Sequence, residues 1–261
     1  MEINTIHFGD AYKLIKELPD KSVDLIVTDP PYQIDGLHKD SGILKGRKNS
    51  HNTQLLQNNL GDGIDLKILD EFVRVMKKIN IYLWCNKEQI YDYLTYFVKE
   101  RGCKFEIIIW AKDNPAPFLN GHYLKDKEYC LFFWEKGVKV KPTFETGKTV
   151  YLSKVNIEDK KQYGHPTIKP LDIIKNIIKN SSGGGSIILD PFSGSGTTCV
   201  AAKELGRNYI GFEIDKKYHQ ISLDRLNGIN KHGQTDLFNT DFEQLSLLEG
   251  EEKWFIYQFG Y

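Results

Sequence analysis

The block Asp29-Pro30-Pro31-Tyr32 holds groups that can act on an amino group attached to a planar ring. The Asp29 carboxylate and the Pro30 carbonyl can accept two N–H bonds and so turn the nitrogen lone pair toward an electrophile. Pro30 and Pro31 stiffen the turn and add no N–H donors. Tyr32 can stack on the ring. Taken alone, the block fits a proline-stiffened strand end with a surface tyrosine equally well, so a second motif has to decide between the two.

A glycine-rich turn between an apolar run and a helical pattern is that second motif. Glycines let the backbone pass close to a ligand, and the free N–H groups at a helix start can bind its polar atoms. A carboxylate, Glu213, ends the next strand-like run, 17 residues after Gly196 (213 minus 196), where it can accept both hydroxyls of an adenosine ribose. The turn consists of Asp190, Pro191, Phe192, Ser193, Gly194, Ser195, Gly196, Thr197 and Thr198.

The spacing in this turn excludes two common nucleotide sites. It lacks the third glycine of a dinucleotide fingerprint and the Gly-Lys-Ser/Thr of a Walker phosphate loop. An adenosyl ligand without a pyrophosphate fits better, and S-adenosylmethionine is the common one. The presence of this turn favours a chemical role for the Asp29 block over a purely structural one.

Alternating strand and helix patterns place both motifs on one sheet. The pattern predicts an α/β fold with a doubly wound, mostly parallel sheet of about seven strands. A Pro/Asn/Gly-rich connection between two of the runs predicts an antiparallel hairpin at one edge. The expected strands are 5–8, 23–28, 79–84, 105–110, 129–134, 187–189 and 209–212.

The length of 261 residues and the hydrophobic content of 40% suit one large domain, which we expect over 1–230, with a C-terminal extension over 231–261. Residues 33–63 form a polar stretch that is too long for an ordinary connection between elements. Such a length is typical of a binding loop. Ten lysines against four acidic residues give the stretch from Lys136 to Lys179 a net charge of +6, which can meet phosphates or form a solvated face.

Several features exclude other classes of protein. No apolar run approaches the roughly 20 residues of a membrane span, and the four cysteines form no C-x-x-C pair. We therefore expect a cytoplasmic protein with reduced thiols. His165 has no second ligand at metal-binding spacing, so we expect no metal. Trp84, Trp110 and Trp134 fall on strands and are expected in the core.

The two motifs, in this order, resemble those of the β-class amino-DNA methyltransferases, a Rossmann-like family in which the D-P-P-Y block precedes the F-x-G-x-G block. The likeness covers about residues 3–226. Asp10 and Ala11 look like the segment that meets the cofactor adenine. His165, Thr167 and Lys169 look like the H-P-T-x-K-P block on the methionine side, with Ile168 where glutamine is frequent. The turn from Asp190 to Thr198, with Glu213 and its neighbour Ile214, matches the rest of the cofactor site.

The resemblance implies transfer of a methyl group from S-adenosylmethionine to N6 of a flipped-out adenine in duplex DNA. It implies that Asp29, Pro30, Pro31 and Tyr32 are catalytic, that Asp29 also borders the cofactor, that 33–63 faces DNA and that 136–163 is a short target-recognition region. A bacterial or phage restriction-modification enzyme or a solitary methylase, with a homodimer and a cognate restriction endonuclease as possible partners, fits this picture. Three alternatives remain open: N4 of cytosine as the target, RNA or a small amine as the substrate, and a nucleic-acid-binding protein without catalysis.

Overall fold

The computed structural model describes residues 1–32, 63–115, 123–154, 163 and 168–229. Strands and helices alternate along most of this length, as the sequence pattern predicts. The strands are β1 (Thr5–Phe8), β2 (Leu25–Thr28), β3 (Asn80–Cys85), β4 (Lys104–Lys112), β5 (Lys127–Trp134), β6 (Val150–Ser153), β7 (Ile187–Asp190) and β8 (Asn208–Glu213). The helices are α1 (Ala11–Leu14), α3 (Ile68–Val75), α4 (Ile90–Leu94), α6 (Leu171–Ser181), α7 (Thr197–Glu204) and α8 (Lys216–Leu226), with a 3-10 turn η1 (Ile15–Glu17) and a π-helical turn η3 (Thr95–Lys99).

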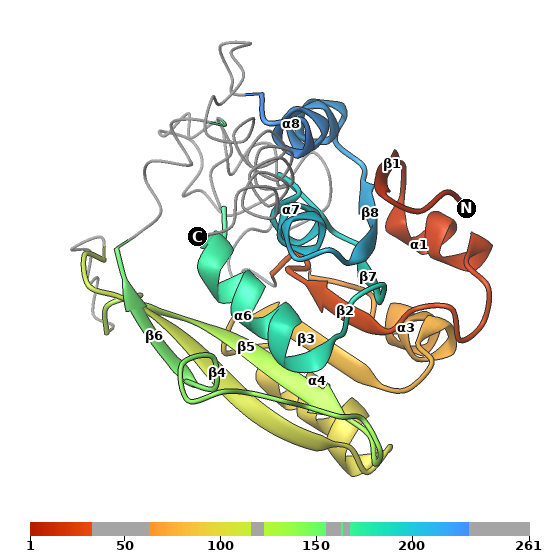
Figure 1. The fold of residues 1–261 in the computed structure, drawn as a ribbon. Coiled ribbons are helices and arrows are strands. Elements are labelled where there is room, and N and C mark those ends of the chain that lie inside the picture. The colour runs from red at the N-terminus through yellow and green to blue at the C-terminus, as the bar shows by residue number, and fades with distance from the viewer. Residues whose placement is uncertain (33–62, 116–122, 155–162, 164–167, 230–261) are drawn as a thin grey trace, which may run out of the picture.

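The strands form one sheet in the order β1-β8-β7-β2-β3-β5-β4-β6 (Figure 1). Five of the neighbouring pairs are parallel, and only the pairs that β5 makes with β3 and β4 are antiparallel. The sheet is therefore mostly parallel and doubly wound, as expected. It has one strand more than the seven expected, because β6 forms inside the lysine-rich region 136–163, where the periodicity is weak.

The antiparallel hairpin of β4 and β5 exists but does not form the edge of the sheet. β5 lies between β3 and β4, and β6 covers the outer side of β4 by pairing parallel to it, with Ile109 opposite Val150. The edge position expected for the hairpin therefore belongs to β6. β6 was not predicted from its own pattern, because its pairing with β4 holds it in place.

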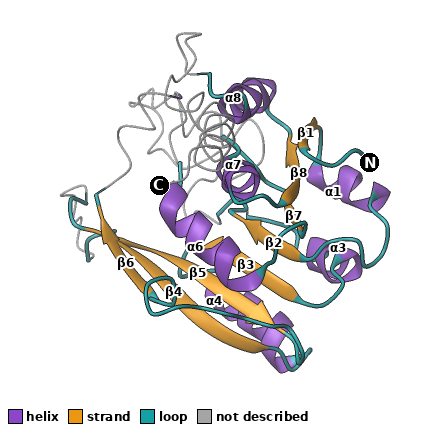
Figure 2. Cartoon of the chain, in the orientation of Figure 1, coloured by secondary structure: helices purple, strands orange, loops and turns teal. Residues whose placement is uncertain are grey.

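Helices cover both faces of the sheet (Figure 2). One core cluster joins α1, η1, α3, α4 and η3 to one face through residues such as Ile15, Phe72 and Phe97. The other joins α6, α7 and α8 to the opposite face through residues such as Ile177 and Ala201. Every residue of β2 and β3 is buried, which explains why these strands are nearly continuous apolar runs rather than alternating ones.

Parallel pairing brings the carboxyl ends of β1, β8, β7, β2 and β3 to one edge of the sheet. Ligands of doubly wound sheets bind at this edge. It is called the carboxyl edge below, and the opposite one the amino edge. None of the helices in the described ranges is long and apolar enough to span a bilayer.

Candidate active site at the carboxyl edge

Asp29 follows directly on β2, beside the end of β7. Thr28, the last residue of β2, donates a hydrogen bond of 2.6 Å from Oγ1 to Oδ1 of Asp190, the last residue of β7. Thr198, in the first turn of α7, donates from Oγ1 to the Val27 carbonyl at 3.3 Å. The fold thus brings together the two motifs that the sequence analysis singled out.

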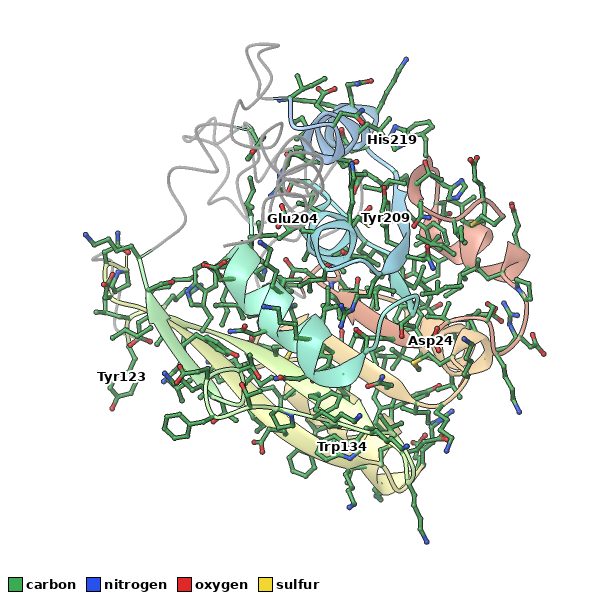
Figure 3. All side chains as sticks on the ribbon, viewed as in Figure 1. Asp24, Tyr123, Trp134, Glu204, Tyr209 and His219 are labelled. Atoms are coloured by element: carbon green, nitrogen blue, oxygen red, sulfur yellow. The ribbon has the colours of Figure 1, made fainter. Side chains whose placement is uncertain are left out.

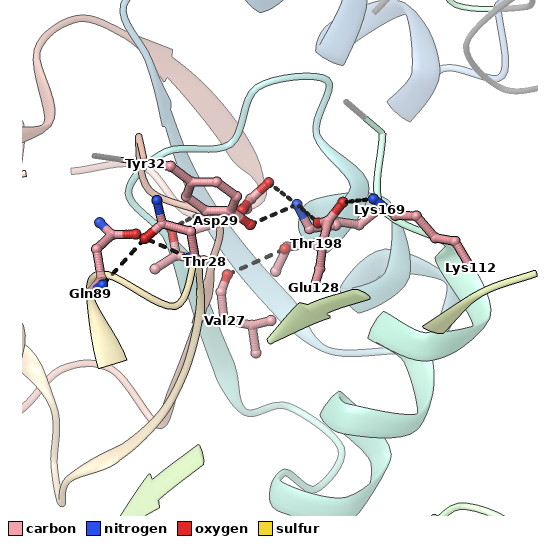
Figure 4. Close-up of polar contacts among 11 residues, drawn as sticks. Val27, Thr28, Asp29, Tyr32, Gln89, Lys112, Glu128, Lys169 and Thr198 are labelled. Carbon is pink, nitrogen blue, oxygen red and sulfur yellow. Dashed lines mark hydrogen bonds and ion pairs between the residues drawn. The ribbon is translucent and has the colours of Figure 1, made fainter. Parts of the chain in front are cut away.

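The Lys169 ammonium lies at the centre of a row of charges beside Asp29 (Figure 4). It is hydrogen-bonded to Asp29 Oδ2, forms an ion pair of 3.0 Å with Glu128 Oε2, and donates to the Tyr32 hydroxyl at 3.3 Å. Its side chain is only 8% exposed. Glu128 Oε1 in turn accepts from Lys112 at 2.5 Å. Two carboxylates and two ammonium groups therefore alternate along the carboxyl edge.

The two carboxyl groups of this row have opposite pKa shifts. Burial raises the pKa of Asp29; the Lys169 ammonium opposes this rise and the Glu128 carboxylate adds to it. For Glu128, burial is outweighed by Lys169 and Lys112, which lower the pKa to about 2. Burial on its own would lower the pKa of Lys169, but Asp29 and Glu128 raise it above its ordinary value. Glu128 is therefore ionised throughout the working range of pH, and Lys169 stays protonated.

The two oxygens of Asp29 have different environments. Oδ2 is engaged by Lys169, whereas Oδ1 is buried and has no hydrogen-bond partner in the described part of the chain. A buried acceptor without a donor costs on the order of 1–3 kcal/mol. An N–H group arriving with a ligand would satisfy it.

Gln89 fixes the turn that carries Tyr32. Its side-chain amide donates to the Pro31 carbonyl at 3.2 Å and to the Tyr93 hydroxyl at 3.3 Å. Pro30 is buried, and Pro31 and Tyr32 are partly exposed. Burial raises the pKa of Tyr32 well above its ordinary value, so its hydroxyl stays neutral and its ring remains an uncharged surface.

The glycine turn connects β7 to α7 through two left-handed residues, Gly194 with φ of 51° and Gly196 with φ of 79°. A Cβ on Gly196 would lie 3.0 Å from Ser222 Cβ and 3.2 Å from Ile6 Cδ1, so conformation and space both require glycine. Ser193 is held by hydrogen bonds from its N and Oγ to the Phe212 carbonyl.

Glu213, the last residue of β8, closes this turn. Its Oε2 accepts from Gly194 N and its Oε1 from Asp215 N, both at 2.8 Å. Each carboxylate oxygen has a second lone pair, so both can still accept from ligand hydroxyls. Burial raises the pKa of Glu213 to about 7, although the two backbone N–H groups oppose the rise. Burial likewise raises the pKa of Asp190 to about 6.

The remaining residues expected around the cofactor take different positions. Asp10 follows β1 and caps α1 by accepting from Tyr12 N, and Ala11 is buried behind it. Phe192 packs edge-on against Tyr12, with ring centroids 6.4 Å apart. Ile214 is exposed. Asp10 lies two residues after β1, beside Glu213 at the end of the neighbouring β8, since Gly9 N donates to the Glu213 carbonyl at 2.9 Å.

The side chains of Ser195 and Thr197 are engaged by the protein itself. Arg225 of α8 donates from Nη1 to both hydroxyl oxygens at 2.9 Å and to the Ser195 carbonyl at 2.8 Å. A ligand contact from these residues would therefore come from the backbone. The H-P-T-x-K-P block is represented only in part, because His165 and Thr167 lie outside the described residues, and Ile168 is buried.

Glu128, Lys112, Gln89 and Arg225 are site residues that the sequence analysis missed. Glu128, Lys112 and Arg225 lie inside ordinary strand or helix patterns, Gln89 lies in the turn before α4, and none belongs to a motif. The available signal in the sequence was a pair of opposite charges, Lys112 and Glu128, next to the expected strands 105–110 and 129–134. Trp84 and Trp110 are buried, as expected, and Trp134 is half-buried.

The first part of the lysine-rich region lies at the amino edge, on the side of the sheet away from this site. β5 ends at Trp134 opposite Asn80, the first residue of β3, and Lys141 N donates to the Asn180 carbonyl near the end of α6. Figure 3 labels Trp134 and Asp24, which mark this edge. β6 and Lys154, which follows it, lie toward the carboxyl edge, so the described residues 136–154 do not form one surface. Residues 155–162 lie outside the described residues, and the target-recognition role expected for 136–163 stays a prediction.

In the described ranges, no three His, Cys, Asp or Glu side chains are grouped so that they could hold a metal ion. The acidic side chains of the site instead pair with lysines or with backbone N–H groups. The expectation that the chemistry needs no metal stays a prediction.

Comparisons with known proteins agree on one family. The family model N6_N4_Mtase, described as a DNA methylase, matches residues 23–224. The Type II methyltransferase M2.LlaDCHI of Lactococcus lactis subsp. cremoris is 30% identical over 245 residues, which cover 84% of this chain and 87% of the relative. M.HinfI, a Type II methyltransferase of Haemophilus influenzae, is 29% identical over 94% of this chain and 72% of its own length.

Two solved structures have the same fold. The complex of M1.HpyAVI with SAM is 29% identical and aligns with a TM-score of 0.61 over 85% of this chain and 99% of its own. The cytosine-N4-specific PvuII DNA methyltransferase aligns with a TM-score of 0.60 over 84% of this chain and 85% of its own, at 19% identity, which shows the fold alone. The chain belongs to the N6/N4 DNA methylase family, and the D-P-P-Y block ahead of the glycine turn places it in the β class.

Proposed function

We propose that this DNA methylase transfers the methyl group of S-adenosylmethionine to N6 of adenine in duplex DNA. The observation that carries the proposal is the Asp29 carboxylate, with one oxygen held by Lys169 and the other buried without a donor. An exocyclic amine supplies that missing donor. The block lies directly beside the glycine turn, where the methyl donor would bind.

Asp29 and Pro30 would orient the amine. Its lone pair is delocalised into the base ring, so the amine is a poor nucleophile until its two N–H groups are held out of that conjugation. Asp29 Oδ1 and the Pro30 carbonyl would accept these N–H groups, and the Tyr32 ring would stack on the flipped-out base. Asp29 does not need to be a strong base, because the amine becomes acidic once it is methylated.

The residues around the glycine turn fit an adenosyl cofactor. The Glu213 carboxylate has a free lone pair on each oxygen for the two ribose hydroxyls, and Asp10 lies at the end of the neighbouring strand, where it can meet the adenine. The left-handed glycines keep the turn free of side chains at this approach. When bound, S-adenosylmethionine supplies the electrophilic methyl group. M1.HpyAVI, which is 29% identical, was crystallised with it.

Adenine is favoured over cytosine by the aspartate of the D-P-P-Y block, since the Asp form in this family mostly implies N6 of adenine. The N4-specific relative shares only the fold with this chain. As finer proposals, the enzyme acts as a homodimer and is paired with a cognate restriction endonuclease, as in the Type II systems for which its relatives are named.

The test is incubation of the purified protein with unmethylated duplex DNA and labelled S-adenosylmethionine, followed by digestion to nucleosides and mass spectrometry. N6-methyladenine is the expected product. N4-methylcytosine would overturn the choice of base and keep the reaction. Label transferred to tRNA but not to DNA would overturn the choice of polymer, and no methylated nucleoside from any DNA or RNA would contradict catalysis.

A further inference from the structure

We propose that Glu128 is a positioning residue for the catalytic carboxylate: it holds the Lys169 ammonium on one oxygen of Asp29 and so keeps the other oxygen open for the substrate amine. The inference rests on the proposed function and extends it. Nothing in the catalytic block or the cofactor turn includes Glu128, which lies about 100 residues along the chain from Asp29 (128 minus 29 is 99).

Three oxygen atoms surround the Lys169 ammonium. An ammonium group has three N–H donors. Lys169 has three acceptors around it, namely Asp29 Oδ2, Glu128 Oε2 at 3.0 Å and the Tyr32 hydroxyl at 3.3 Å. The contact with Glu128 Oε2 is an ion pair without hydrogen-bond geometry, so Glu128 Oε2 and Asp29 Oδ1 are both buried without a hydrogen bond among the described residues. Lys169 bonds to Oδ2 of Asp29 and not to Oδ1, and the Glu128 carboxylate attracts the ammonium from the far side.

Glu128 can take this position because β5 runs antiparallel to β3. The first residues of β5 therefore reach the carboxyl edge, where Tyr129 pairs with Cys85, the last residue of β3. Lys112, the last residue of β4, then holds the other oxygen of Glu128 at 2.5 Å, and its ammonium lies 4.9 Å from the centre of the Trp110 ring. Glu128 is therefore fixed from the side away from Asp29.

Removal of Glu128 would take away the second carboxylate that attracts the Lys169 ammonium, which would then move toward Asp29. A buried ammonium with one carboxylate left would bond to both oxygens of that carboxylate, since an unsatisfied buried donor is costly. Asp29 Oδ1 would then be occupied before the base arrives. Binding of the cofactor should change little, because Lys169, which is expected at the cofactor, stays paired with Asp29 in the variant, and the contacts of Glu128 do not reach the glycine turn or Glu213.

Steady-state kinetics of Glu128→Gln on duplex DNA test the proposal. We expect kcat to fall on the order of 10- to 100-fold, as for a misplaced reacting group, while KM for S-adenosylmethionine stays within about twofold. Glu128→Asp, which keeps the charge, should recover part of the loss. Glu106→Gln is the matched control, because it removes an exposed carboxylate from the neighbouring strand β4 and should behave like the unmodified protein.

A second readout does not depend on turnover. The buried Lys169 ammonium, with three acceptors, should give a slowly exchanging N–H signal in proton–nitrogen NMR, assigned by its loss in Lys169→Arg. In Glu128→Gln this signal should shift and exchange faster. If Glu128→Gln does not fold, Lys112→Gln removes the outer anchor and should lower kcat several-fold in the same way, again without a change in cofactor KM.

The outcomes separate this inference from the proposed function. An active unmodified enzyme whose Glu128→Gln variant keeps full kcat, or loses kcat and cofactor affinity together, would overturn the positioning role alone. So would an ammonium signal that Glu128→Gln leaves unchanged. An unmodified protein that methylates no DNA would overturn the proposed function, while the NMR comparison would still establish or refute the contact between Glu128 and Lys169.

Discussion

Thr28 and Asp190, which are 162 residues apart in the chain, are joined by a buried hydrogen bond of 2.6 Å at the carboxyl edge of the sheet. Thr28 immediately precedes the Asp29-Pro30-Pro31-Tyr32 block, and Asp190 opens the glycine turn. Because β2 and β7 are parallel neighbours, the bond ties the block that would orient the base to the turn that would hold the cofactor. The distance between the two reactants depends on this connection.

Thr28→Val should therefore weaken both stability and activity. Valine has nearly the shape of threonine but removes the shorter of two hydrogen bonds to Asp190 Oδ1, leaving that from Phe192 N at 3.2 Å. Loss of one such bond costs about 0.5–1.5 kcal/mol of unfolding free energy. Urea unfolding measures the loss. Thr28→Ser keeps the hydroxyl and serves as the control, so equal stability of the serine and valine variants would contradict this role for the bond.

Asp29→Ala should abolish turnover and keep cofactor binding. Lys169 retains Glu128 as a partner, so the substitution leaves no unpaired buried ammonium. We expect kcat to fall at least about 100-fold, as for loss of an orienting group, with an unchanged Kd for S-adenosylmethionine in calorimetry. Asp20→Ala, at an exposed carboxylate that pairs with Arg74, is the control. Turnover by the Asp29 variant at the unmodified rate would refute the assignment.

Affinity for the cofactor should rise with pH because of Glu213. Its pKa of about 7 in the folded protein lies above the ordinary value of 4.5, so the folded state keeps a proton that the unfolded state releases. Stability of the cofactor-free protein should accordingly fall as pH rises from about 4.5 to 7. The ionised carboxylate is the better acceptor for ribose hydroxyls, so the affinity should increase about tenfold between pH 6 and 8.

The Glu213→Gln variant is the control for this pH dependence. It should bind the cofactor more weakly and show a flatter pH profile. Asp190, with a pKa of about 6, titrates in the same range. The contribution of Glu213 is therefore the difference between the pH profile of the unmodified protein and that of Glu213→Gln. If the glutamine variant kept the full pH dependence, the effect would belong to another group.

The lysines at the amino edge should not contribute to DNA binding at the active site. Lys136, Lys139 and Lys141 are exposed on the side of the sheet away from Asp29, whereas Lys154 follows β6 at the carboxyl edge. Replacing the first three with glutamine should leave the salt dependence of DNA affinity unchanged. Lys154→Gln should reduce the slope of log K against log salt by about 1.

Fluorescence anisotropy with labelled duplex DNA at several salt concentrations measures both slopes. A triple variant with a slope reduced by about 3 would mean that DNA reaches the amino edge as well. That result would restore the single positively charged surface expected from the lysine count.

Local sequence was sufficient for the elements that carry the two motifs. The continuous apolar runs of β2 and β7 and the residues that end them follow from burial on both faces and from the special backbone of proline and glycine. These properties act over a few neighbouring residues, so Asp29, Gly196 and Glu213 could be singled out before the fold was seen. The resemblance to β-class enzymes extended this to their expected roles.

The order and direction of the strands determined the contacts around the site that the motifs do not include. The antiparallel course of β5 brings Glu128 to Lys169 and carries Lys141 away from the site, and β6 becomes a strand only because β4 offers it a free edge. No local pattern encodes these contacts, because each joins segments that are distant in the chain and its energy appears only when the sheet has formed. The sequence by itself thus determined the reacting groups, and the tertiary structure determined which charges hold them in place.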